Sequence, residues 1–141
     1  MQKVYREFFS DKEVLFVGYS SRSKGFSNGI YDAFSKHGIK VYPFNKKQGA
    51  NYDLKVFNSY DDLVKIPTTA YVLLNKSNTN DAIQELLNHD VKRILVHSKS
   101  HVDSSVLSQC EAKGVEVTAG CPMMLFGGGI HKLHAFFAGV H

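Results

Sequence analysis

The sequence predicts an α/β protein with a mostly parallel β-sheet, and two observations indicate that class. Short, continuously apolar runs such as residues 14–17 and 70–74 recur along the chain, and such runs are typical of strands buried on both faces. Segments of about 10–15 residues with apolar side chains at helical spacing separate these runs. Strands that alternate with helices form βαβ units, which make neighbouring strands parallel.

The length and composition suit a single domain. The 141 residues are 43% hydrophobic and 21% charged, which are ordinary values for a globular protein. No apolar run reaches the roughly 18 residues that a membrane helix needs, and the first ten residues lack the apolar stretch of a signal peptide. Cys110 and Cys121 are too few for a disulfide framework. We therefore expect one domain over residues 1–141, in the cytoplasm and with reduced cysteines.

The first elements follow from the positions of glycine and the apolar runs. The first strand ends at Gly18, and a helix over residues 27–36 follows it, with Ser27 as the N-cap and Gly38 at the end. Residues 39–44 predict the second strand. These elements form the first βαβ unit of the sheet.

The middle of the chain predicts a short strand, a turn and a long strand. Residues 55–57 predict the short third strand, and residues 59–64 predict a small helix or turn that ends before Pro67. The five apolar residues at 70–74 predict the fourth strand, which is the clearest in the sequence.

Two further helix and strand pairs complete the pattern. A helix over residues 80–89 precedes a strand at 93–97, and a helix that begins at Asp103 and ends at Gly114 precedes the last strand at 115–118. The expected parts of the domain are a leading helix at about residues 2–9, a core at about 13–125 and a helical tail at about 130–138.

The loop after the first strand predicts a phosphate site. Residues 18–29 contain three glycines, four serines, Arg22 and Lys24, and they lead into a helix N-terminus. Helix N-termini bind anions through free N–H groups and the helix dipole. The alternative is an ordinary βα loop. The loop matches neither the G-x-G-x-x-G fingerprint nor a P-loop, which disfavours ATP hydrolysis by a Walker mechanism.

The positive charge lies in the first third of the chain. The net charge is +4, and residues 1–50 hold nine Lys and Arg against four Asp and Glu. Lys46 and Lys47 follow the second strand, where an NAD-binding domain usually has an acidic residue that binds the ribose hydroxyl. Lysines there favour a ribose phosphate, as in coenzyme A (CoA) or NADP. A solvated lysine pair is the alternative.

The loops after the later strands contribute an apolar residue and a cysteine. The cysteine has two alternative roles, as a wall of the site or as a nucleophile. Leu74 ends an apolar strand and could line an apolar arm of a ligand. Cys121 is interpreted as a wall of the site rather than as a nucleophile. His131 and His134 are spaced to share a helix face, and with Cys121 and His141 they could bind zinc, but no Cys-x-x-Cys or His-Glu-x-x-His frame is present. We therefore expect no metal site.

Four segments together carry a resemblance to a known family; they are residues 18–23, 41–46, 56–64 and 120–122, of which the last contains the Cys-Pro pair. In their order and spacing they resemble the CoA-binding domain family, the small Rossmann-like proteins related to the N-terminal domain of the succinyl-CoA synthetase alpha subunit. The resemblance covers roughly residues 11–125. It implies a Rossmann-like three-layer sandwich with a mostly parallel sheet of five to six strands.

The resemblance also implies where CoA binds. The first loop would contact the CoA phosphates, the lysine after the second strand would lie near the ribose phosphate, the loop after residues 70–74 would follow the pantetheine arm, and the Cys-Pro segment would lie near the sheet rim. The implied residues are Gly18, Ser20, Ser21, Arg22 and Ser23, then Lys46, then Leu74 and Asn75, then Cys121 and Pro122. The synthetase's phosphorylated histidine lies in a second domain without a counterpart in these 141 residues, so ligase activity is not implied.

The expected function is therefore a stand-alone module that binds CoA or an acyl-CoA without catalysis of its own. The alternative is an enzyme that depends on NADP or that uses Cys121 in thiol or acyl transfer. Nucleic-acid binding through the basic first third is disfavoured because no aromatic-rich basic motif accompanies the charge. No membrane partner is expected, and a homo-oligomer or a partner enzyme stays open.

Overall fold

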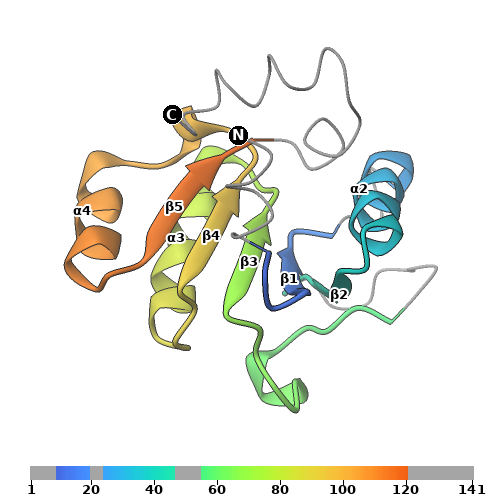
Figure 1. The fold of residues 1–141 in the computed structure, drawn as a ribbon. Coiled ribbons are helices and arrows are strands. Elements are labelled where there is room, and N and C mark those ends of the chain that lie inside the picture. The colour runs from blue at the N-terminus through green and yellow to red at the C-terminus, as the bar shows by residue number, and fades with distance from the viewer. Residues whose placement is uncertain (1–8, 20–23, 47–54, 121–141) are drawn as a thin grey trace.

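A five-stranded parallel sheet forms the centre of the protein (Figure 1). The computed structural model describes residues 9–19, 24–46 and 55–120. The sheet order is β2-β1-β3-β4-β5, and every pair of neighbouring strands is parallel. The strands are β1 (Glu13–Val17), β2 (Lys40–Phe44), β3 (Thr69–Val72), β4 (Arg93–Val96) and β5 (Glu116–Ala119). The predicted α/β class with a parallel sheet is confirmed.

Helices cover both faces of this sheet, which gives three layers (Figure 1). Helix α2 (Lys24–Lys36) packs on one face, and helices α3 (Lys76–Leu87) and α4 (Ser104–Ala112) pack on the other. Two short 3-10 helices, η1 (Tyr60–Asp62) and η2 (Lys99–His101), lie in the connections. None of these helices has the length and hydropathy that would let it span a membrane.

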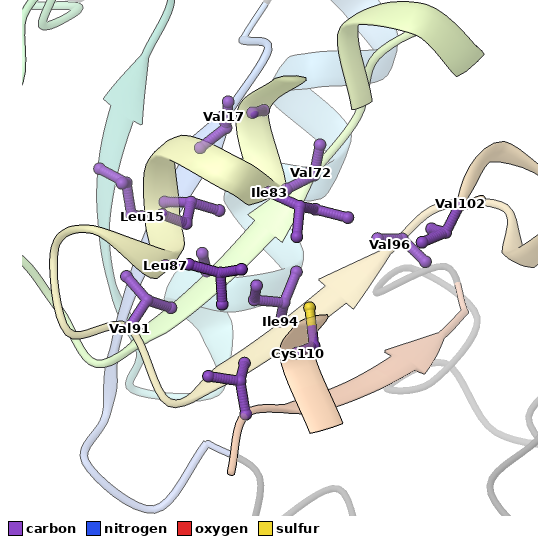
Figure 2. Packing of buried hydrophobic residues seen from close by; sticks show 14 of the residues in the cluster. Leu15, Val17, Val72, Ile83, Leu87, Val91, Ile94, Val96, Val102 and Cys110 are labelled. Atoms are coloured by element: carbon purple, nitrogen blue, oxygen red, sulfur yellow. The ribbon is translucent and has the colours of Figure 1, made fainter. Parts of the chain in front are cut away.

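The two faces of the sheet differ in the kind of side chain they bury. The α2 face is aromatic, with Phe16 against Tyr71 at 5.2 Å between ring centroids and Phe34 against Tyr71 at 6.0 Å, both edge to face. The α3 face is mostly aliphatic (Figure 2), with Ile83 from α3 and the thiol of Cys110 from α4 packed over the strands. Apolar burial on both faces explains why the central strands β1, β3 and β4 are mostly apolar in the sequence.

The third predicted strand is not a strand. Residues 55–57 make only an isolated parallel bridge, in which Phe57 pairs with Phe44 at the outer edge of β2. This bridge is held by two backbone hydrogen bonds, from Phe57 N to Pro43 O and from Asn45 N to Phe57 O, each 2.9 Å long. The described sheet therefore has five strands, the lower of the two numbers predicted.

Two helices begin earlier than the sequence pattern predicts. Helix α2 begins at Lys24, so Ser27 is a buried residue inside the helix and not its N-cap. Helix α3 begins at Lys76 instead of residue 80, with Asn75 as its N-cap. Gly38 and Gly114 end α2 and α4 as predicted, with φ values of 74° and 70°. Residues 2–8 of the expected leading helix and the whole helical tail lie outside the described residues, and Phe9 lies in a turn.

Candidate functional site

The carboxyl ends of β1, β2 and β3 meet at one edge of the sheet, where the winding of the chain reverses. The chain passes from β1 to β2 on one side of β1 and then returns to place β3 on its other side. Open parallel sheets bind their ligands at such a reversal, outside the carboxyl ends of the strands. The first place to look for a ligand is therefore just beyond Val17, Phe44 and Val72.

A cavity of about 250 Å³ lies at this reversal point. That volume is slightly below the roughly 300 Å³ at which drug-sized sites begin, so it would hold part of an extended ligand rather than all of it. One wall comes from the strand ends and is called the strand wall; the other comes from α3 and is called the helix wall. The strand wall is Val17, Gly18, Phe44, Asn45, Lys46 and Leu74, and the helix wall is Asn78, Asp81, Ala82 and Glu85.

Gly18 joins the three strand ends and leaves no room for a side chain. Its N–H donates to Phe44 O at 2.8 Å, and its φ is +98°, a conformation that favours glycine. A Cβ atom built on Gly18 would lie 2.2 Å from the carbonyl oxygen of Leu73 and 2.9 Å from the Cδ2 atom of Leu74. Glycine therefore lets the chains after β1 and β3 approach closely at the cavity.

Asn45 fixes the turn after β2, and the sequence analysis did not single it out. Its side-chain amide donates to Tyr19 O at 2.8 Å, and its own carbonyl accepts from the Asn58 amide at 2.8 Å. These bonds tie the segment after β2 to the segment after β1 and to residue 58. An asparagine directly after a predicted strand was the available signal, because its side chain readily bonds nearby backbone.

The helix wall begins just after the N-cap of α3, which is Asn75. The side-chain oxygen of Asn75 accepts from the Asn78 N–H at 2.9 Å, which satisfies one of the free donors of the first turn of α3. Asp81 and Glu85 are four residues apart and both line the cavity. Ala82, which is small and buried, lies between them in the sequence. This wall is therefore polar and acidic.

Lys46 pairs with Glu85 across the cavity. The Lys46 ammonium contacts Oε2 of Glu85, and 63% of the lysine side chain is exposed against 34% for the glutamate. Sequence reasoning placed Lys46 at a ribose phosphate but missed Glu85. The signal for Glu85 was the spacing from Asp81, but its relation to Lys46 depends on how α3 docks on the sheet.

A stack of rings lies behind Phe44, one of the residues that line the cavity. The Tyr60 ring packs against Phe44 at 4.5 Å and against His89 at 4.2 Å between centroids. The Tyr60 hydroxyl oxygen is buried and has no hydrogen-bond partner among the described residues. Burial, and to a smaller extent the negative charge of Glu85, raises the pKa of Tyr60 well above its ordinary value of 10.0. Tyr60 is therefore a neutral support beside Glu85.

The end of β4 and the loop after it hold the segment that carries Leu74. The Tyr71 hydroxyl lies 2.9 Å from Nδ1 of His97, and Nδ1 of His101 lies 3.1 Å from Leu74 O. The side-chain amide of Asn80 donates to His101 O at 3.1 Å, which links this loop to α3. These contacts position Leu74 at the cavity.

Cys110 does not provide a reactive group for this site. Its thiol is buried between α4 and the sheet (Figure 2), and burial raises the pKa of the thiol above its ordinary value. A raised pKa disfavours the thiolate, which is the nucleophilic form. Within residues 9–19, 24–46 and 55–120 no group of three His, Cys, Asp or Glu side chains is arranged to hold a metal ion.

Comparison with known families identifies the kind of domain that carries this cavity. The family model described as "CoA binding domain" matches residues 12–126, which is most of the chain. The protein belongs to the CoA-binding domain family. The resemblance predicted from the sequence segments is thereby confirmed, over nearly the same residues.

The fold of this CoA-binding domain recurs in other solved structures. A hypothetical protein from Pyrococcus horikoshii OT3 is 20% identical, with 89% of both chains covered and a TM-score of 0.72. A protein from Thermus thermophilus is 17% identical, with 89% of this chain and 96% of that chain covered and a TM-score of 0.71. A conserved hypothetical protein from Pyrococcus furiosus is 19% identical, with 86% of this chain and 97% of that chain covered and a TM-score of 0.62. No curated protein matches the sequence.

The described part of this CoA-binding domain brings three predicted site residues to one place. Gly18, Lys46 and Leu74 come from three different strand ends and line the same cavity. Asn75 lies next to them, where its side-chain oxygen caps α3. The remaining predicted residues lie outside the described residues; they are Ser20, Ser21, Arg22, Ser23, Cys121 and Pro122.

Proposed function

We propose that the protein binds coenzyme A or an acyl-CoA as a stand-alone cytoplasmic module, without catalysis of its own. Membership of the CoA-binding domain family supports the class of ligand. The observation that carries the proposal is the convergence of Gly18, Lys46 and Leu74, three residues far apart in the sequence, on one cavity at the reversal point of the sheet.

In this proposal the ligand extends along the carboxyl ends of the strands. The ribose phosphate lies at Lys46, beyond β2, because an exposed ammonium group attracts a phosphate there. The pyrophosphate lies over the loop that begins at Gly18 and contains Ser20, Ser21, Arg22 and Ser23. The pantetheine arm passes Leu74 and Asn75, and Cys121 and Pro122 form a neutral wall. The 250 Å³ cavity would hold the nucleotide end of such a ligand.

A thermal-shift comparison tests the proposal. The protein is heated with CoA, dephospho-CoA, acetyl-CoA, NAD or NADP at matched concentrations. A ligand at about 100 times its Kd adds about 2.7 kcal/mol, which raises the Tm of a domain of this size by several degrees. We expect a shift with CoA or acetyl-CoA. A shift with NADP alone would instead favour the NADP-dependent enzyme, and no shift with any of the five would contradict the proposal.

Arg22→Ala separates ligand chemistry from stability. If Arg22 contacts the pyrophosphate, this variant weakens CoA binding and leaves the Tm of the ligand-free protein nearly unchanged. Arg93→Ala is the matched control, because Arg93 lies at the start of β4 and pairs with Asp11 at 2.9 Å, away from the cavity. We expect Arg93→Ala to lower the Tm and leave CoA affinity unchanged. A large loss of ligand-free stability in Arg22→Ala would mean that Arg22 is structural.

A further inference from the structure

The cavity contains more negative than positive side chains among the described residues. Lys46 is its one described cation, and Asp81 and Glu85 are its two described carboxylates, so these three groups sum to a net charge of −1 at neutral pH. The two acids lie on one face of α3 because residues four apart are neighbours on a helix. This balance is unexpected at a place where a phosphate-bearing ligand is proposed to bind.

The glutamate belongs to an anchored helix, whereas the lysine is the more exposed partner of the ion pair. Glu85 lies within α3, which is anchored on the sheet by the fully buried Ile83 and Leu86 and capped by Asn75. The Lys46 side chain is 63% exposed and follows β2 on a four-carbon stem. An arriving phosphate can therefore reorient Lys46, but the carboxylate of Glu85 stays close to the new pair.

We propose that Glu85 sets how strongly the site prefers a ribose phosphate, by competing with that phosphate for Lys46. This inference rests on the proposed CoA-binding function. With Glu85 present, the ribose phosphate has to break one ion pair to form another, and it has to approach a carboxylate. The preference for CoA over dephospho-CoA is therefore smaller than a free lysine would give, and Glu85 is a specificity-determining residue that acts through Lys46.

Calorimetric titration with CoA and dephospho-CoA tests this role. The proteins are the wild type, Glu85→Gln, Lys46→Met and the double variant, and the quantity compared is the ratio of the Kd for dephospho-CoA to the Kd for CoA. We expect Glu85→Gln to raise this ratio about threefold to fivefold, the size of an exposed ion pair, and mainly through tighter binding of CoA. In the Lys46→Met background the same change has no such effect, because no lysine is left to release.

Asp81→Asn is the matched control, because it removes the other carboxylate of the same cavity, whereas the ion pair of Lys46 is with Glu85. If the inference is right, any effect of Asp81→Asn on the ratio is smaller and does not depend on Lys46. Equal effects of the two substitutions, both persisting in Lys46→Met, would overturn the inference in favour of general charge repulsion.

The remaining outcomes separate this inference from the proposed function. If the wild type binds CoA and Glu85→Gln leaves the ratio unchanged, the role of Glu85 is overturned and the proposed function stands. If CoA binds neither the wild type nor any variant, both are overturned. Binding of CoA that first becomes measurable in Glu85→Gln, and is lost again in the double variant, would support the inference in its strongest form.

Discussion

The strand wall and the helix wall of the cavity are built on different principles. The strand wall depends on backbone: Gly18 N donates to Phe44 O at 2.8 Å, Leu73 N donates to Val17 O at 2.9 Å, and a Cβ at Gly18 has no space. The helix wall depends on side chains, because Asp81 and Glu85 line the cavity and Glu85 pairs with Lys46. If the proposed function is right, the comparison teaches that backbone topology sets the place of the ligand, whereas a few charged side chains set which ligand is preferred.

The largest expected effect comes from filling the strand wall at Gly18. Gly18→Ala places a Cβ against the Leu73 carbonyl at a φ of +98°, so the strand ends have to separate. We expect the free energy of unfolding to fall by more than about 2 kcal/mol, measured by urea denaturation, and CoA binding to be lost. Gly114→Ala is the control, because its φ is +70° and, among the described residues other than its chain neighbours, no heavy atom lies within 4 Å of the added Cβ. It should cost about 1 kcal/mol; equal losses would show that Gly18 is not closely packed.

Removing the Lys46 charge tests the role of charged side chains in ligand preference. Lys46→Met should weaken CoA binding about threefold to tenfold, because it removes a charge-assisted contact and leaves Glu85 without its partner. Binding of dephospho-CoA should change by less than about twofold, as measured by calorimetry. Lys40→Met serves as the control, since Lys40 lies at the other end of β2, over the ring of Tyr42. If the two variants lose CoA affinity equally, the effect belongs to overall charge and not to the cavity.

The start of the helix wall depends on the cap at Asn75. Asn75→Ala removes the acceptor for the Asn78 N–H, and we expect a loss of about 1 kcal/mol in the free energy of unfolding. Asn75→Asp keeps an acceptor oxygen at the same place and should lose much less in the same denaturation measurement. An equal loss in both variants would contradict the cap as the source of the effect.

The smallest expected effect is a gain in stability on removal of the Tyr60 hydroxyl. Tyr60→Phe removes a buried hydroxyl that has no partner among the described residues, so the free energy of unfolding should rise by about 1 kcal/mol near neutral pH. The pKa of Tyr60 is raised in the folded protein, so an unfolded tyrosine ionises first as the pH rises above 10.0. Above pH 10.0 the free energy of unfolding should therefore fall more steeply with pH in the wild type than in Tyr60→Phe. A loss of stability in Tyr60→Phe at neutral pH would mean that the hydroxyl is satisfied.

Much of the fold could be predicted because its signals are local. The central strands β1, β3 and β4 are short, mostly apolar runs, and Gly38 and Gly114 end helices as their positions indicate. The convergence of Gly18, Lys46 and Leu74 also follows from sequence, because parallel strands place their carboxyl ends at one edge. The strand predicted at residues 55–57 was wrong. A β-propensity pattern does not reveal that only Phe57 pairs with a neighbouring strand.

The charge relations of the cavity could not be predicted in the same way. Lys46 and Glu85 are 39 residues apart, and their contact depends on the position and rotation of α3 on the sheet. That docking is decided by the buried residues of α3, such as Ile83 and Leu86, together with the strands beneath them. The sequence therefore predicted that Lys46 contacts a ligand phosphate. It did not indicate that Lys46 already forms an ion pair with Glu85.

Mapping of backbone amide shifts during a CoA titration tests most directly whether this cavity is the ligand site. The ¹⁵N-labelled full chain is titrated with CoA, and the perturbed amides are compared with the walls of the cavity. We predict saturable shifts at Gly18, Asn45, Lys46 and Leu74, which line the strand wall, with little change at the amino-terminal end of the sheet around Lys40 and Arg93. Saturable shifts confined to other parts of the molecule would contradict the assignment of the cavity as the CoA site.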